Sequence, residues 1–257
     1  MNRIVVIGAS NFIAFSLCKK LIEEEYEVLS IETEQQQRKE TDEMLMEIGR
    51  NAFFQYKNVE SLELLESESG VAAFYFPEKK LTENEKKHLN NLSQLFEIVY
   101  IIQRVDTAND DWIEYLDSLG NVVMILFNEV FGPWQPEKDT IQRIIFNKVE
   151  GKMDCDGEND MVVEKDYIYV EDVSKLLVSL LESKERIHQK VLLVTNPNKN
   201  VSDELAVELS IKLSKVNKSP IRKGESVWNV IDCKPTYTVK QAVEDHVLHS
   251  KIRRKRM

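Results

Sequence analysis

Apolar and polar residues alternate with two different patterns along this chain. Some stretches, such as Arg3–Ile7 and Val122–Phe127, are short, continuous and apolar, which is typical of strands buried on both faces of a sheet. Between such runs the apolar residues recur at helical spacing, first in the stretch from Phe12 to Ile22. Strands that alternate with helices predict an α/β protein whose parallel sheet is covered by helices on both faces.

The first two thirds of the chain carry this alternation. The predicted strands are Arg3–Ile7, Glu27–Ile31, Ala52–Tyr56, Gly70–Phe76, Ile98–Ile102 and Val122–Phe127. The predicted helices are Thr41–Ile48, Thr82–Phe96 and Asp110–Leu119, besides the one that starts at Phe12. The fourth strand ends at Pro77, because proline lacks the N–H that a central strand needs for its ladder.

The pattern changes after Pro133. The stretch Thr140–Val149 predicts a helix, and the acidic segment DCDGEND predicts a turn between two short extended pieces. The run KDYIYVEDVSKLLVSLLES then predicts a strongly amphipathic helix with Asp172 as its cap. After the predicted strand Val191–Thr195, a further helix is expected with Ser202 as its cap. The chain closes on the basic segment KIRRKRM, for which we expect either a solvated tail or a contact with an anionic surface.

Composition narrows the functional classes. A formal net charge of −10 over 257 residues argues against a general nucleic-acid binder. No apolar run reaches the length of a membrane span. The three cysteines are scattered and odd in number, which fits a reduced, cytoplasmic compartment without structural disulfides. The four histidines show no metal-ligand spacing, so we expect no metal site.

The turn after the first strand, GASNFIA, resembles an incomplete nucleotide-binding turn. Dinucleotide-binding turns use three glycines, for the bend, for backbone approach to the pyrophosphate and for helix–strand packing. Here Gly8 is kept and Ala14 adds one methyl at the third position. At the second position Asn11 tolerates positive φ, so the bend can survive, whereas its side chain takes up space that a phosphate needs. The start of the following helix is an anion site in either case.

Four stretches in this order, and a fifth near the end of the chain, resemble the extended short-chain dehydrogenase/reductase family, the NAD(P)-dependent nucleotide-sugar epimerases and dehydratases. GASNFIA is similar to G-x-x-G-x-x-G, FNEVFGPWQ to N-V-Y-G-P, and KDYIYVEDVSKLL to R-D-Y-I-x-V-x-D-V. VLLVTNPNKNVSDELAVEL is similar to the family's return to the sheet and entry into the substrate lobe, and CKPTYTVKQAVEDHV to its closing helix.

The resemblance spans nearly the whole chain. It implies a Rossmann-type doubly wound parallel sheet of six or seven strands with a small C-terminal substrate lobe. We expect the dinucleotide-binding core at residues 1–135 and 166–197, and the lobe at 136–165 and 198–257. By the same resemblance we expect a homodimer that pairs through Thr82–Phe96 and Asp110–Leu119.

The resemblance also implies a cofactor site. A carboxylate at Glu32, where the second strand ends, would accept a hydrogen bond from the adenosine ribose and repel the extra phosphate of NADP, so NAD is the expected dinucleotide. The alternative is that Glu32 is an ordinary surface glutamate without a role in cofactor binding. The residues expected at the cofactor are Gly8, Ser10, Asn11, Phe12, Ile13 and Glu32.

The family's catalytic pair has no counterpart in this chain. The family uses a tyrosine as acid or base, with a lysine four residues later on the helix after the fifth strand. No lysine lies between Lys87 and Lys138, the region that would carry the pair. Tyr75 has Lys79 four residues on, but this pair lies one strand too early and contains Pro77. The catalytic residues therefore stay unassigned.

Two substrate positions are also altered. Glu129 stands where the family has an asparagine, and Lys165 stands where it has an arginine that often contacts substrate phosphates. Two functions stay open. One is a non-catalytic protein that binds a nucleotide, a nucleotide sugar or a protein partner, which the missing Tyr–Lys pair favours. The other is an active, divergent NAD(P)-dependent epimerase, dehydratase or reductase with relocated catalytic residues, which the retained Gly8 and Glu32 keep open.

Overall fold

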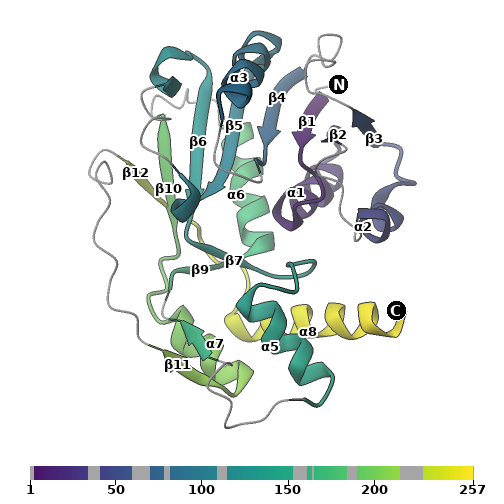
Figure 1. Ribbon diagram of the computed structural model, residues 1–257, viewed down its shortest axis with the longest axis vertical. Coiled ribbons are helices and arrows are strands. Elements are labelled where there is room, and N and C mark those ends of the chain that lie inside the picture. Colours follow the sequence, from purple (N-terminus) through teal and green to yellow (C-terminus); the bar gives the residue numbers. More distant parts are fainter. Residues whose placement is uncertain are drawn as a thin grey trace.

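A single parallel sheet forms the centre of the molecule (Figure 1). The computed structural model describes residues 3–33, 41–59, 70–77, 82–108, 115–152, 161–163, 165–183, 190–214 and 228–256. In sheet order the strands are β12 (Asn229–Asp232), β10 (Val191–Thr195), β6 (Val122–Phe127), β5 (Phe96–Arg104), β4 (Gly70–Tyr75), β1 (Arg3–Ile7), β2 (Glu27–Thr33) and β3 (Phe54–Val59). The order reverses between β1 and β4, which confirms the predicted Rossmann-type doubly wound class, with eight strands instead of six or seven.

Helices cover both faces of the sheet. On one face α1 (Phe12–Glu23), α2 (Thr41–Ile48) and α6 (Val170–Glu182) bury apolar residues such as Leu17, Met44 and Val173 in one core cluster. On the other face α3 (Glu83–Leu95) buries Leu89 and Leu92 in a second cluster. Of the expected helix Asp110–Leu119, only the end is described, and residues 115–118 are helical there.

A smaller lobe lies below the carboxyl edge of the sheet in Figure 1. Its helices are α5 (Thr140–Val149), α7 (Val201–Leu209) and α8 (Val239–Arg256), and α8 packs against the other two. Two short parallel pairs accompany them, β7 (Glu129–Phe131) with β9 (Tyr167–Tyr169) and β8 (Met161–Val163) with β11 (Lys212–Ser214). β12 lies in the expected lobe range 198–257, yet it pairs with β10 at the edge of the main sheet. The acidic segment 154–160 lies outside the described residues.

Two expected helix caps lie inside their helices, because tertiary contacts occupy their side chains. The N-cap of α6 is Tyr169, and Asp172 accepts hydrogen bonds from the backbone N–H and hydroxyl of Thr236. The N-cap of α7 is Asn200, and the Ser202 hydroxyl exchanges hydrogen bonds with the backbone of Lys165. Both side chains therefore join segments that are distant in sequence.

The basic C-terminal segment forms the last turns of α8 and is not a disordered tail, although Lys251, Ile252 and Lys255 are exposed to solvent. Arg253 is only 4% exposed, its Nε lies 3.5 Å from a carboxylate oxygen of Glu43, and its guanidinium lies over the ring of Trp134. Arg254 pairs with Glu150 at 3.0 Å. Apolar packing and paired charges hold this segment against α2 and α5. None of the described helices combines the length and the apolar character that a bilayer crossing needs.

Candidate nucleotide site

The turn between β1 and α1 lies at the switch point of the sheet, where such folds bind their ligands. Gly8 has φ +90, and a Cβ there would come within 2.7 Å of the Phe76 carbonyl oxygen, so only glycine fits. The Gly8 N–H donates to the Ile31 carbonyl and the Phe76 N–H to that of Ile7. These bonds hold the turn between the ends of β2 and β4.

Asn11 caps α1 in place of the family's second glycine. Its φ of −74 and ψ of 131 are ordinary extended values, so tolerance of positive φ is not needed at this position. Its side-chain Oδ1 accepts a hydrogen bond from the Ile13 N–H at 2.9 Å. An N–H at the start of a helix is a donor that a bound phosphate commonly uses. Here a side chain of the protein itself already takes it.

Glu32 is fully buried and turns towards the same turn. Its Oε2 accepts a hydrogen bond of 2.6 Å from the Ser10 N–H, and none of the residue is exposed. The surface-glutamate alternative is therefore excluded. The carboxylate lies where the sequence places it, at the end of β2, but it binds the backbone of the turn.

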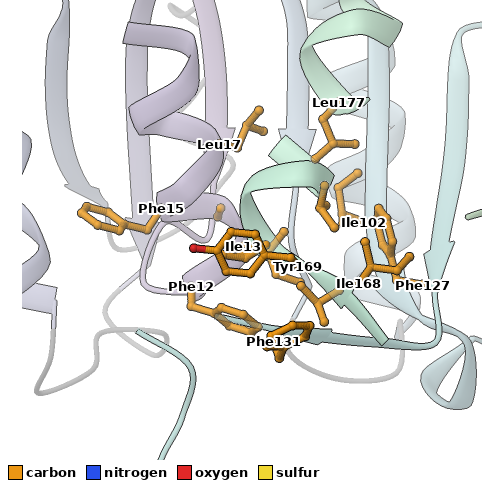
Figure 2. Close-up of a cluster of buried hydrophobic side chains, with 14 of the residues drawn as sticks. Phe12, Ile13, Phe15, Leu17, Ile102, Phe127, Phe131, Ile168, Tyr169 and Leu177 are labelled. Atoms are coloured by element: carbon orange, nitrogen blue, oxygen red, sulfur yellow. The ribbon is translucent and has the colours of Figure 1, made fainter. Parts of the chain in front are cut away.

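Phe12 and Ile13 contribute to the site through their backbone. Both side chains are 8% exposed and join the larger core cluster. Figure 2 shows them among Phe131, Ile168 and Tyr169, so that the start of α1 packs on the β7–β9 pair. This packing places the start of α1 beside the β7–β9 pair, which accompanies the smaller lobe.

The backbone of the turn fits a dinucleotide, whereas two of its side chains compete with one. Gly8 and the helix start keep the geometry that a pyrophosphate needs, and Ala14, with no exposed surface, keeps the helix close to the sheet. The N–H groups of Ser10 and Ile13, however, already donate to Glu32 and Asn11. A pyrophosphate that used these two donors would have to displace both side chains.

Glu129 and Lys165, the two residues expected at the substrate, lie together and form an ion pair. Arg104, at the end of β5, donates to the same Glu129 oxygen at 3.0 Å and to Asp106 at 2.8 Å. We call Arg104, Glu129 and Lys165 the charge cluster. The Glu129 side chain is 14% exposed, while those of Arg104 and Lys165 are 42% and 43% exposed. Sequence reasoning did not link Arg104 to this pair, because its partners come from other strands.

Asp139 lies near the charge cluster. Its pKa is raised above the ordinary value, mainly by burial, and the charge of Glu129 acts in the same direction. The charge of Arg104 and a hydrogen bond from Gln135 act in the opposite direction. A carboxyl group with a raised pKa beside an arginine is a candidate acid or base. Nothing in the sequence pattern marked it, since it precedes α5 in a polar turn.

The hydroxyls of Tyr75, Tyr100 and Tyr115, the tyrosines in and just after β4 and β5, all form hydrogen bonds within the protein. The Tyr75 hydroxyl lies 3.3 Å from a Glu85 carboxylate oxygen, and burial, followed by the charge of Glu85, raises its pKa. Burial raises the pKa of Tyr100 to about 12, and its hydroxyl donates to the Leu180 carbonyl. Tyr115 donates to the Lys86 carbonyl at 2.7 Å, on the α3 side of the sheet. Lys79 lies outside the described residues.

No family model and no curated protein sequence matches this chain. Solved structures do match. The UDP-glucuronic acid 4-epimerase of Bacillus cereus, in complex with UDP-glucuronic acid and NAD, is 14% identical with a TM-score of 0.65, over 97% of this chain and 99% of that one. The dTDP-glucose 4,6-dehydratase of Bacillus anthracis, in complex with NAD, is 13% identical with a TM-score of 0.67, over 99% and 98%.

A third match is an NAD-dependent NDP-hexosamine 5,6-dehydratase of tunicamycin biosynthesis, which is 13% identical with a TM-score of 0.65, over 97% of each chain. At these identities the likeness is one of fold. Over almost its whole length, this chain has the fold of the NAD-dependent extended short-chain dehydrogenases/reductases that act as nucleotide-sugar epimerases and dehydratases.

Proposed function

We propose that this protein is a catalytically degenerate relative of the nucleotide-sugar epimerases and dehydratases, and that it binds a nucleotide or nucleotide sugar without hydride transfer. The observation that carries the proposal is the environment of Tyr75, Tyr100 and Tyr115, the tyrosines of the region that would supply a catalytic base. Their hydroxyls bond to Glu85 and to two backbone carbonyls, and burial raises all three pKa values. A tyrosine with a raised pKa is a poor base near neutral pH.

The turn supports the proposal from the cofactor side. When bound, NAD would supply a hydride acceptor, and the turn from Gly8 to Ile13 would hold its pyrophosphate, with Glu32 near the adenosine ribose. In this chain Glu32 and Asn11 instead bond to the turn itself. We therefore propose weak NAD binding, and weaker NADP binding because the Glu32 carboxylate repels a further phosphate.

The charge cluster supports nucleotide binding from the substrate side. Arg104 and Lys165 both bond to Glu129, Arg104 bonds to Asp106 as well, and both cationic side chains keep access to solvent. The phosphates of a nucleotide sugar carry more charge than Glu129 and present several acceptor oxygens to the two cations. Such a ligand therefore competes with Glu129 for both cations.

Asp139 favours the second function, an active divergent enzyme. Its raised pKa and its position near Arg104 give this region a group that can exchange protons, independently of any tyrosine. In that case the retained Gly8 turn would hold a working cofactor.

The two functions differ in turnover. The protein is incubated with NAD or NADP and a panel of UDP-, GDP- and dTDP-sugars, and both cofactor absorbance and product identity are followed. If the protein is catalytically degenerate, no nucleotide sugar is converted, and calorimetry detects the binding of nucleotide sugars. Turnover at ordinary enzyme rates that Asp139→Asn abolishes would establish the alternative, and turnover abolished by Tyr75→Phe or Tyr115→Phe would show that a catalytic tyrosine has survived.

A further inference from the structure

We propose that Asn11 and Glu32 are built-in competitors of the dinucleotide, so that these two side chains hold the turn closed to a pyrophosphate. The inference rests on the weak NAD binding proposed above and gives its cause, and it does not depend on the binding of a nucleotide sugar. The backbone of the turn has the shape that a dinucleotide needs. We therefore assign the obstruction of the site to the side chains of Asn11 and Glu32.

Asn11 supplies the first competing group. Its backbone adopts φ −74, so the conformation does not call for glycine, and what the side chain adds is an acceptor. Oδ1 lies 2.9 Å from the Ile13 nitrogen, at the hydrogen-bonding distance of a phosphate oxygen bound to a helix start. Glycine at this position offers no such acceptor and leaves the N–H to the ligand.

Glu32 supplies the second group that competes with the dinucleotide. Its Oε2 lies 2.6 Å from the Ser10 nitrogen, and the residue has no exposed surface. The negative charge therefore lies within the turn, close to the positive end of α1 that would otherwise attract a phosphate. A pyrophosphate loses a donor to Glu32 and meets a like charge at short range, and both effects weaken its binding.

Together the Asn11 and Glu32 side chains occupy two backbone N–H donors of the same turn, those of Ile13 and Ser10. They originate from different elements, the N-cap of α1 and the end of β2, yet both place a side-chain oxygen on a backbone N–H. Removing one contact leaves the other, so we expect each single substitution to recover part of the NAD affinity and the double substitution to recover more.

The test uses Asn11→Gly, Glu32→Asp and the double variant. Aspartate keeps the charge that a ribose needs, but its shorter side chain cannot reach the Ser10 N–H from the same Cα position. Asn51→Gly is the matched control for the first change, because Asn51 accepts a similar bond from the Phe53 N–H far from the site. Glu27→Asp, at the other end of β2, is the control for the second.

NAD affinity is measured by calorimetry, and the exchange of the Ser10 and Ile13 amides by NMR. We expect each single variant to bind NAD about threefold to tenfold more tightly, the factor that one hydrogen bond is worth. We expect the controls to match the wild type. The Ile13 amide should lose protection only where Asn11 is changed, and the Ser10 amide only where Glu32 is changed.

The amide measurement keeps the proposal falsifiable apart from any activity. Protection of neither amide in the wild type would show that the turn is open. Equal or weaker NAD binding in both single variants, or no detectable binding in the double variant, would likewise overturn the proposal. If Asn11→Gly fails to fold, Asn11→Ala removes the same acceptor at a backbone conformation that alanine adopts freely, and the same outcomes decide.

Discussion

Glu129 shows how a single residue can change the charge that a site presents to a ligand. At a position where the resembled family has a neutral asparagine, it brings a carboxylate that two cations share. Arg104 and Lys165 are thereby compensated without a ligand, although both remain accessible to solvent. The site therefore holds two cationic side chains and an internal anion that pairs with both.

Replacing this anion should expose the cations. In Glu129→Gln, Arg104 and Lys165 lose their shared carboxylate, so we expect UDP to bind about tenfold more tightly, as charge-assisted hydrogen bonds are worth more than neutral ones. Calorimetry at low ionic strength measures the change, since salt screens exposed charges. The control is Glu137→Gln, which removes an exposed carboxylate from the same loop region. Unchanged UDP affinity in Glu129→Gln would argue against an anion site at the charge cluster.

At the scale of elements, α8 depends on a buried polar network as well as on apolar packing. His246 has no exposed surface and lies 2.6 Å from the Gln142 side-chain oxygen of α5, and Gln142 donates to the Ser250 hydroxyl. Because the amide oxygen can only accept, the histidine Nε2 carries a proton and donates. Burial, followed by the charge of His249, lowers the pKa of His246 to about 3.

This network predicts a loss of stability in acid. The folded state holds His246 neutral, whereas the unfolded chain takes up a proton below about pH 6.5, so stability falls as pH drops from there towards about 3. The slope from this one group approaches ~1.4 kcal/mol per pH unit. Urea unfolding at pH 7.5 and pH 5 measures it. In His246→Gln the loss between these two values should be smaller, and in the control His88→Gln it should equal that of the wild type. Equal losses in all three proteins would contradict the assignment.

At the scale of the whole molecule, the layers bring the turn, the end of β5 and the β7–β9 pair to one edge. The reversal of strand order between β1 and β4 opens this edge to a ligand, and the lobe of α5, α7 and α8 lies beside it in Figure 1. Arg253 adds a connection from the end of α8 to Glu43 of α2. The fold of the matching solved structures is therefore present over almost the whole chain, while Glu32, Asn11 and the charge cluster form bonds within the protein.

The homodimer stays a proposal at this scale. In the described part of α3, the residues that face outwards are polar, among them Glu83, Lys87 and Asn90, while Leu89 and Leu92 are buried against the sheet. The sequence offers Trp112, Ile113 and Leu116 as apolar residues for the same interface. Leu116 is fully buried in the second core cluster, and Trp112 and Ile113 lie outside the described residues. Since a polar interface gains little from apolar burial, we expect a weak dimer that dissociates on dilution. Sedimentation equilibrium measures this, and a monomer at tens of micromolar, on the order of an ordinary homodimer's working range, would remove the proposal.

The sequence by itself determined the order of the elements, the glycine that the first turn needs and the lack of any lysine between Lys87 and Lys138. These follow from local features, since apolar periodicity reports which face of an element is buried, and Gly8 is required by its own φ. Most predicted elements accordingly match the structure within a few residues, as β6 and α5 do at both ends.

Only the tertiary structure decided what the polar side chains at the site do. Glu32 and Ser10 are 22 residues apart, Lys165 and Glu129 are 36 apart, and β12 joins the sheet beside a strand that lies far earlier in the chain. No local pattern encodes such encounters, because a hydrogen bond or an ion pair depends on which distant segment packs alongside. A carboxylate at the end of β2 can be read from the sequence, but whether it faces a ribose or the turn beside it is set by the approach of the two strands and the helix between them.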